Sequence, residues 1–237
     1  MGAAAKRVER YDWQAISADL DEQGWARLPR LLTARDCNAM RALYPRDGLF
    51  RATVDMARHG FGRGEYRYFA APLPPLVAEL RAALYVPLAV TARDWARRLG
   101  RDPNVYSQTV DGFLARCHAA GQRRPTPLLL RYLPGDWNAL HQDLYGAVAF
   151  PLQVLIVLSQ RDRDYEGGEV VLVEQRPRAQ SRAMAFELAC GEGLIFTNRE
   201  RPVRGTRSDY RVAMRHGVSA LTAGERLTLG IIFHDAQ

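Results

Sequence analysis

The chain has 237 residues, of which 47% are hydrophobic and 25% are charged, and its formal net charge at pH 7 is +7. This length and composition suit a single globular domain with a sizeable hydrophobic core. The longest apolar run, residues 150–158, is far too short to span a bilayer, so no membrane partner is expected.

The positive charge comes almost entirely from arginine: of the 33 basic residues, only Lys6 is a lysine. An excess of positive charge favours anionic partners such as nucleic acids. A GC-rich genome produces the same arginine bias, so the charge does not identify the partner. The N-terminal residues lack the apolar core of a signal peptide, and we therefore expect a cytoplasmic protein.

The three cysteines, Cys37, Cys117 and Cys190, are odd in number, widely spaced and outside any CxxC pair. This pattern favours neither a disulfide framework nor a zinc knuckle. We expect reduced, buried thiols.

Residues 1–125 are predicted to be mainly helical. One helix ends at Gly24 and is followed by a short strand, and Thr33 with Asp36 forms a capping box for the next helix. The predicted helices cover residues 13–23, 33–44, 74–84, 91–99 and 109–121.

Residues 59–75, with the sequence HGFGRGEYRYFAAPLPP, combine cationic and aromatic side chains. Arg63 and Arg67 alternate with Tyr66 and Tyr68, and such a mixture can stack bases and pair phosphates. Three glycines would allow the segment to act as a lid over a substrate. The alternative is a loop and strand whose aromatic side chains pack on the core.

From residue 126 onwards, short β-rich segments separated by turn residues dominate. They lie at residues 128–133, 149–158, 168–174, 183–189, 193–198, 210–221 and 225–234. We predict an α+β protein with a jelly-roll, or double-stranded β-helix, core over residues 126–237. The helical region of residues 1–125 would wrap this core, so that the chain forms one integrated catalytic domain.

His141 and Asp143 form an H-x-D motif. On an extended backbone, residues i and i+2 point to the same face, so an imidazole and a carboxylate can hold one metal ion. His216, 75 residues after His141, lies at the end of another strand-like segment and is the candidate third ligand. Two histidines and one carboxylate on one face suit a non-haem Fe(II) oxygenase. Alone, an H-x-D motif is more often a surface turn.

The other three histidines are interpreted as surface residues. His59 falls in a predicted loop, His118 near the polar end of a helix, and His234 close to a C-terminus where disorder is expected.

Arg226 lies ten residues after His216, within a predicted strand. If the two strands are adjacent, its guanidinium can point into the same barrel mouth and would need an anionic partner there. The distal carboxylate of 2-oxoglutarate could supply one through a bidentate pair. Alternatively, Arg226 faces solvent on an edge strand.

Together these motifs resemble the Fe(II)/2-oxoglutarate-dependent dioxygenases. The segment RYLPGDWNALHQD (131–143) is similar to the AlkB-like alkylation-repair branch, which reads R-Y-x-P-G, four residues, L-H-Q-D. The segments EGGEVVL (166–172) and RHGVSALTAGERLTLGIIF (215–233) are similar to prolyl-hydroxylase-type members. The resemblance covers residues 126–235.

The resemblance implies Fe(II) ligation by His141, Asp143 and His216, with dioxygen as the oxidant. It also implies that Arg226 binds the distal carboxylate of the cosubstrate 2-oxoglutarate and that Tyr132 hydrogen-bonds this cosubstrate.

Two positions depart from the repair branch. Leu130 stands where that branch has an asparagine, and Ile232 stands where it has a second arginine. Both departures count against a repair function.

Three functions therefore remain open. The first is oxidative demethylation or dealkylation of alkylated single- or double-stranded DNA, in DNA repair. The second is hydroxylation of a prolyl peptide or a small metabolite. The third, a non-catalytic jelly-roll binding module, would be indicated by a missing ligand, and none of the ligands is missing. The sequence does not indicate the oligomeric state.

Overall fold

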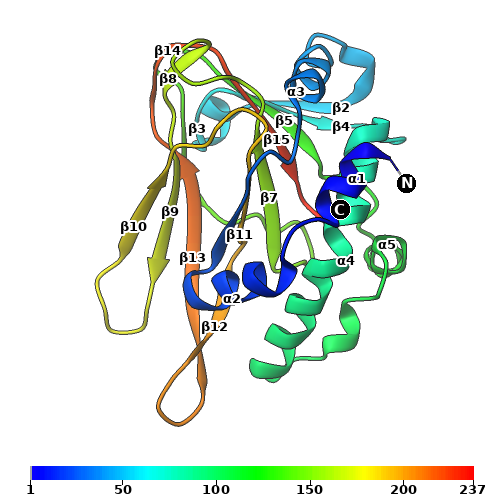
Figure 1. Ribbon diagram of the computed structural model, residues 1–237, viewed down its shortest axis with the longest axis vertical. Helices are drawn as coiled ribbons and strands as arrows, with labels where there is room; N and C mark the ends of the chain where they lie inside the picture. Colours follow the sequence, from blue (N-terminus) through cyan, green and yellow to red (C-terminus); the bar gives the residue numbers. More distant parts are fainter. Residues whose placement is uncertain (1) are drawn as a thin grey trace.

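The computed structural model describes residues 2–237, shown in Figure 1. The helices are α1 (Ala3–Val8), α2 (Trp13–Gln23), α3 (Ala34–Arg41), α4 (Pro75–Arg98) and α5 (Val110–Ala119). The strands of the first 125 residues are β1 (Trp25–Leu28), β2 (Phe50–Asp55), β3 (Gly62–Arg63) and β4 (Glu65–Phe69). The later strands are β5 (Leu128–Tyr132), β6 (Trp137–His141), β7 (Leu152–Val157), β8 (Tyr165–Gly167), β9 (Val170–Gln175), β10 (Arg182–Phe186), β11 (Gly193–Thr197), β12 (Glu200–Arg204), β13 (Asp209–Val218), β14 (Leu221–Gly224) and β15 (Arg226–Ile231).

Two antiparallel sheets form the core of the fold. The seven-stranded sheet has the order β1-β11-β7-β15-β5-β4-β2, and the six-stranded sheet has the order β10-β9-β13-β6-β3 with β12 on β13. Helices cover the outer side of the seven-stranded sheet, whereas β9, β10 and β13 form the opposite side of the molecule (Figure 1). This arrangement confirms the predicted α+β fold with a double-stranded β-helix core.

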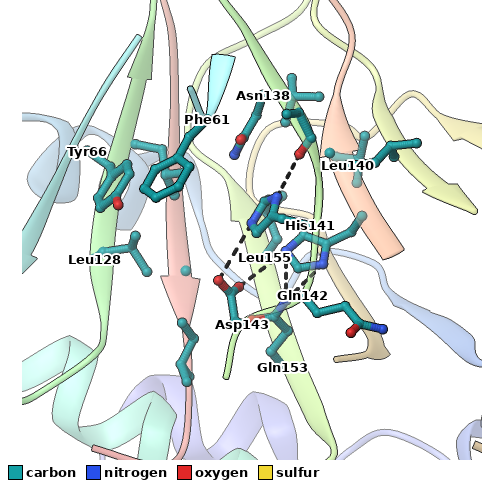
Figure 2. A pocket seen from close by; sticks show the side chains of 18 of the residues that line it. Phe61, Tyr66, Leu128, Asn138, Leu140, His141, Gln142, Asp143, Gln153 and Leu155 are labelled. Carbon is teal, nitrogen blue, oxygen red and sulfur yellow. Dashed lines mark hydrogen bonds and ion pairs between the residues drawn. The ribbon is translucent and has the colours of Figure 1, made fainter. Parts of the chain in front are cut away.

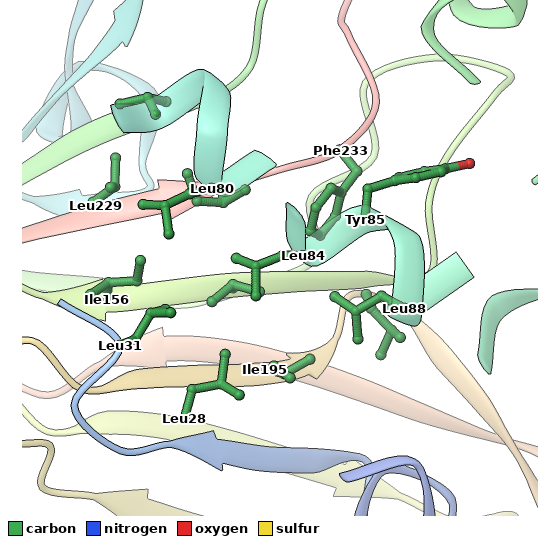
Figure 3. Close-up of a cluster of buried hydrophobic side chains, with 14 of the residues drawn as sticks. Leu28, Leu31, Leu80, Leu84, Tyr85, Leu88, Ile156, Ile195, Leu229 and Phe233 are labelled. Carbon is green, nitrogen blue, oxygen red and sulfur yellow. The ribbon is translucent and has the colours of Figure 1, made fainter. Parts of the chain in front are cut away.

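The main hydrophobic core lies between α4 and the seven-stranded sheet (Figure 3). Leu80, Leu84 and Leu88 recur every fourth residue and so share one face of α4. They belong to the same buried cluster as Ile156 of β7 and Leu229 of β15, and all five side chains are fully buried. Burial of each such side chain stabilises the fold by roughly 1.5–3 kcal/mol. This packing holds in place the sheet that carries part of the site.

Helix α4 is continuous, although two separate helices were predicted in this region. Pro87 lies inside it and removes one backbone hydrogen bond, which costs about 3 kcal/mol in an isolated helix. Burial of α4 against the sheet outweighs this cost. By length and composition α4 could cross a membrane, but half of its most apolar stretch is buried inside the domain, as in a core helix.

The first 125 residues contribute strands to both sheets as well as helices. β1 pairs with β11, and β4 pairs with both β2 and β5. The predicted capping box of Thr33 and Asp36 is confirmed at the start of α3. The N-terminal region therefore forms part of the sheets of the jelly roll.

The C-terminus is anchored in the core. Asp235 pairs with Arg81 at 2.7 Å, and both side chains are 4% exposed. His234 is fully buried, and its Nδ1 accepts a hydrogen bond from the Phe150 backbone at 3.2 Å. The expectation of a surface histidine near a disordered end is wrong for His234, because β15 carries the following residues directly into the core. Burial lowers the pKa of His234 to about 4.

This depressed pKa predicts a loss of stability in mild acid. The unfolded state takes up the proton at about pH 6.5 and the folded state only near pH 4, so stability falls as the pH decreases between these values. We expect His234 to account for about 2 kcal/mol of loss between pH 6.5 and 5. His234→Asn, which keeps an acceptor for Phe150, should flatten this pH dependence in urea unfolding. His59→Gln, at an exposed histidine, should not, and equal profiles for the two variants would contradict the assignment.

Candidate metal and cosubstrate site

The H-x-D motif lies at the end of β6. His141 is the last residue of β6, and Asp143 follows two residues later. Strand β13 pairs with β6 in a register that places His216 opposite His141. A slip of one residue would turn His216 to the outer face. The register therefore brings together three side chains from two distant segments.

The three side chains converge closely enough to hold one metal ion. Their potential ligand atoms all lie within 4.8 Å of one another. Nε2 of His141 is 3.5 Å from Asp143 Oδ1, and Nε2 of His216 is 3.2 Å from Asp143 Oδ2. Nδ1 of His141 lies 2.7 Å from the Ala139 carbonyl, which fixes the tautomer and leaves Nε2 free for a metal.

Electrostatics keep the donor groups in the protonation states that a metal requires. Burial alone raises the pKa of Asp143, but the hydrogen bond and charge of His216, together with the charge of His141, hold the pKa well below its usual range. Burial, reinforced by His141, lowers the pKa of His216. These shifts favour the ionised carboxylate at Asp143 and disfavour the protonated imidazole at His216, and metal ligation requires both.

Tyr145 orients the carboxylate. Its hydroxyl donates to Asp143 Oδ1 at 2.6 Å, and the Tyr68 hydroxyl donates to Tyr145 at 3.0 Å. Burial, followed by the charge of Asp143, raises the pKa of Tyr145, so this phenol keeps the proton that it donates. Tyr145 could not be recognised as a site residue from the sequence, because its only signal there is its place two residues after Asp143.

The backbone of Asp143 is held by the buried side chain of Asn198. The Asn198 Oδ1 accepts from the Asp143 N–H at 2.9 Å, and its Nδ2 donates to the Asp143 carbonyl. Gln153 of β7 is also buried, and its Nε2 lies 3.0 Å from His216 Nε2. In the sequence, Gln153 stood out only as the polar interruption of an apolar run.

Arg226 is a buried cation close to the rings of Tyr132 and Tyr165. It is 1% exposed, and its Nε and Nη1 have no hydrogen-bond acceptor among residues 2–237. The buried hydroxyl of Thr228, on the same face of β15, is also without a partner in this range. Because an unpaired buried charge is costly, this arrangement fits a bound anion. Gly168 leaves room for the arginine, since a Cβ there would lie 3.0 Å from Arg226 Cδ.

Tyr132 lines the cavity that contains the three donor residues and is also a neighbour of Arg226. It is opposite Arg226 in the pairing of β5 with β15, and its ring centre is 5.7 Å from the guanidinium carbon. Burial raises the pKa of Tyr132 to about 12, and its hydroxyl accepts a hydrogen bond from Asn138 at 3.3 Å. Leu130 and Ile232, the two positions that depart from the repair branch, line the same cavity.

The cavity has a volume of about 320 Å³ and is lined mainly by apolar and aromatic side chains. Figure 2 shows Phe61, Tyr66 and Leu128 on one side of it and His141 and Asp143 on the other. Its volume and lining suit a small or flat organic group.

The four predicted substrate residues separate into two groups. Tyr66 and Tyr68 line the cavity. Arg67 points to the other face of β4, where it binds Asp47 at 2.7 Å and Glu65 at 3.0 Å. Arg63 is 65% exposed and lies outside the cavity lining. Because β4 is paired on both sides, alternation along the strand separates the tyrosines from Arg67. Residues 65–69 form part of the cavity wall, which matches the alternative to a lid.

Several aromatic and apolar side chains are exposed near the cavity mouth. Phe61, 47% exposed, and Leu140, 45% exposed, line the cavity, and Leu140 also lines a shallow depression with Trp137, which is 42% exposed. Arg63 is the direct neighbour of Trp137 in the pairing of β3 with β6. This set of Phe61, Arg63, Trp137 and Leu140 is called the rim below.

Comparisons with known proteins identify similar chains. Residues 64–236 match the Oxygenase-NA family, described as an oxygenase catalysing oxidative methylation of damaged DNA. The uncharacterized protein Rv2227 of Mycobacterium tuberculosis is 52% identical over 168 residues, which cover 71% of this chain and 72% of that protein.

Two solved structures share the fold. An oxidoreductase of the 2OG-Fe(II) oxygenase family from Burkholderia pseudomallei gives a TM-score of 0.52 at 18% identity, covering 96% of this chain and 93% of that chain. A prolyl hydroxylase from Trichoplax adhaerens, in complex with a hypoxia inducible factor peptide fragment, gives a TM-score of 0.53 at 14% identity, covering 97% of this chain and 91% of that chain.

The hydrogen bond from Tyr145 generates a prediction about metal affinity. Tyr145→Phe keeps the ring but removes the donor to Asp143, and loss of such a partner weakens metal binding about 10- to 100-fold. Anaerobic calorimetric titration with Fe(II), or with Mn(II) as a substitute, measures this change. Tyr66→Phe is the control, because its hydroxyl lines the same cavity without a bond to Asp143. Equal affinities in the wild type and Tyr145→Phe would show that Tyr145 does not support the site.

Proposed function

The chain belongs to the Oxygenase-NA family, and from this premise we propose that it removes alkyl groups from damaged nucleic acid by hydroxylating the alkyl carbon. It is a 2-oxoglutarate- and Fe(II)-dependent oxygenase, an oxidoreductase that uses Fe(II), 2-oxoglutarate and dioxygen. When bound, these three supply the oxidant that inserts oxygen into a C–H bond, while 2-oxoglutarate becomes succinate and carbon dioxide.

His141, Asp143 and His216 are the proposed iron ligands. The single observation that carries this assignment is the convergence of their ligand atoms within 4.8 Å. A two-histidine, one-carboxylate set leaves positions open for a cosubstrate and dioxygen. Tyr145 would hold the carboxylate in place, and Asn198 would hold the backbone that carries it.

Arg226 is the proposed partner of the distal carboxylate of 2-oxoglutarate. Its unpaired guanidinium lies on the cavity-facing side of β15, which it shares with Gly230 and Ile232 of the cavity lining. The unpaired hydroxyl of Thr228 can donate to the same carboxylate. Tyr132 would separate this anion from the apolar part of the cavity and orient it through its hydroxyl.

The remaining cavity would bind the alkylated base. Its aromatic walls, including Tyr66 and Phe61, can stack on a planar group and exclude water from the reacting carbon. Asn138 lines the cavity and offers its side-chain carbonyl oxygen as an acceptor to a base edge.

Two further observations support a nucleic acid as the substrate. The net charge of +7 favours a polyanion. At the rim, the exposed aromatic rings of Phe61 and Trp137 lie beside the cation of Arg63, and this combination binds the bases and phosphates of a single strand.

A second candidate, hydroxylation of a prolyl peptide or a small metabolite, is favoured by Leu130 and Ile232. Both line the cavity and cannot hydrogen-bond a base, whereas an apolar pyrrolidine ring would fit against them.

A turnover assay distinguishes the two candidates. With Fe(II), 2-oxoglutarate and dioxygen, succinate formation is compared between methylated single-stranded DNA and proline-rich peptides. We expect stimulation by methylated DNA and release of formaldehyde, both abolished in His141→Ala, Asp143→Ala and His216→Ala. Stimulation by peptides alone would reject the repair function, and full activity in any of the three variants would remove that residue from the site.

Replacing Arg226 should affect the cosubstrate specifically. Arg226→Leu removes charged hydrogen bonds to 2-oxoglutarate, and its KM should rise roughly 10- to 100-fold. Without 2-oxoglutarate the variant should unfold no more easily than the wild type, because it removes an unpaired buried charge. A 2-oxoglutarate-induced rise in melting temperature in the wild type that is absent in the variant tests this assignment. Arg211→Leu, at an exposed position on β13, is the control. An unchanged KM in Arg226→Leu would exclude the assignment.

A further inference from the structure

Two of the three cysteines, far apart in the sequence, meet in the fold. Cys37 lies on α3 and is fully buried, whereas Cys190 lies in the turn before β11 and is partly exposed. Cys117, on α5, belongs to a different part of the structure. All three are free thiols.

The turn that carries Cys190 packs directly against the start of α3. The Leu32 N–H donates to the Gly191 carbonyl at 2.9 Å, next to Cys190 in the chain. A Cβ added at Gly191 would lie 3.5 Å from the Cys37 sulfur, so Cys37 touches this turn. The thiols of Cys37 and Cys190 are close enough for each to shift the pKa of the other, and the Cys190 thiol donates to the Leu158 carbonyl at 3.3 Å. Two cysteines on adjoining segments can be joined by a disulfide where their Cα atoms lie within about 7 Å of each other.

The surroundings of Cys190 favour its thiolate form. The neighbouring Cys37 thiol lowers the pKa of Cys190 to about 7, and the guanidinium groups of Arg163 and Arg41 contribute to the lowering. The opposing charge of Asp164 is shared between these two arginines, which it binds at 2.9 and 2.7 Å. Because it is partly exposed and readily deprotonated, Cys190 is the more nucleophilic of the pair.

We propose that Cys37 and Cys190 form an oxidative modification site, a dithiol that hydrogen peroxide converts into a disulfide joining α3 to the turn before β11. Cys190 is the attacking residue, and Cys37 is the resolving residue. This inference does not depend on the proposed substrate.

The chemistry balances with one peroxide for each pair of thiols. The Cys190 thiolate attacks one peroxide oxygen, so that an S–O bond forms, the O–O bond breaks, and the leaving hydroxide is protonated to water. The Cys37 sulfur then attacks the resulting sulfenic acid. An S–S bond forms, the S–O bond breaks, and the second oxygen leaves as water with the proton of Cys37. Two thiols lose two electrons in total, and peroxide gains them.

The disulfide would tether the turn before β11, and β11 leads to a residue that supports the metal site. β11 begins three residues after Cys190 and leads to Asn198, which holds the backbone of Asp143. A covalent link between α3 and this turn also constrains the unfolded chain over a long loop, which stabilises the folded state.

The test counts the thiols of the full-length protein before and after treatment with hydrogen peroxide. Untreated protein, denatured and alkylated, should carry three adducts, because all three cysteines are free. After peroxide we expect one adduct, at Cys117, an intact mass lower by about 2 Da before alkylation, and a peptide linking Cys37 to Cys190. Dithiothreitol should restore three adducts. Cys117→Ser is the matched variant and should form the same disulfide.

A thermal measurement provides a second readout. We expect the melting temperature of the oxidised protein to exceed that of the reduced protein by roughly 5 °C or more. Cys190→Ser should show no such difference. Three adducts after peroxide, oxidation of Cys190 to the sulfinic acid without a link, or a disulfide through Cys117 would each overturn the proposal.

Discussion

The pairing of β13 with β6 is the constraint on which the site depends. Only the register that sets His216 opposite His141 turns both imidazoles to the same interior face. Hydrogen bonds between the two strands and the burial of Met214 and Val218 on the inner face of β13 fix that register. The metal site is therefore specified by the same interactions that close the jelly roll.

Two charged side chains, Asp143 and Arg226, lie in the interior of the barrel and differ in whether they have hydrogen-bond partners. The Asp143 carboxylate accepts a hydrogen bond from Tyr145, and its backbone N–H and carbonyl both bond the Asn198 side chain, so its position is fixed before a metal arrives. Arg226 is the opposite case, because two of its nitrogens are buried without an acceptor in residues 2–237. A protein retains such a cost where binding of an anion removes it. The folded chain thus combines a preorganised carboxylate at Asp143 with a buried cation at Arg226 that lacks an acceptor for two of its nitrogens among residues 2–237.

The cavity and the rim differ in the groups that they would present to a substrate. The apolar positions Leu130 and Ile232 provide no polar group for recognition inside the cavity. Outside it, Phe61, Trp137 and Arg63 present exposed rings and a cation. A nucleic acid would use both regions, because one base enters the cavity while its neighbours and phosphates remain at the rim.

The sequence alone determined the chemistry and the fold class. The H-x-D motif, the later histidine and the arginine ten residues on limited the possible functions, and alternation of apolar residues predicted the strands of the jelly roll. Local patterns could not decide contacts that depend on which strands become neighbours. The alternation of β4, paired on both sides, sent Arg67 away from the cavity and Tyr66 into it. Packing of the last residues buried His234, and the turn before β11 brought Cys190 to Cys37, because tertiary packing joins segments that no local periodicity relates.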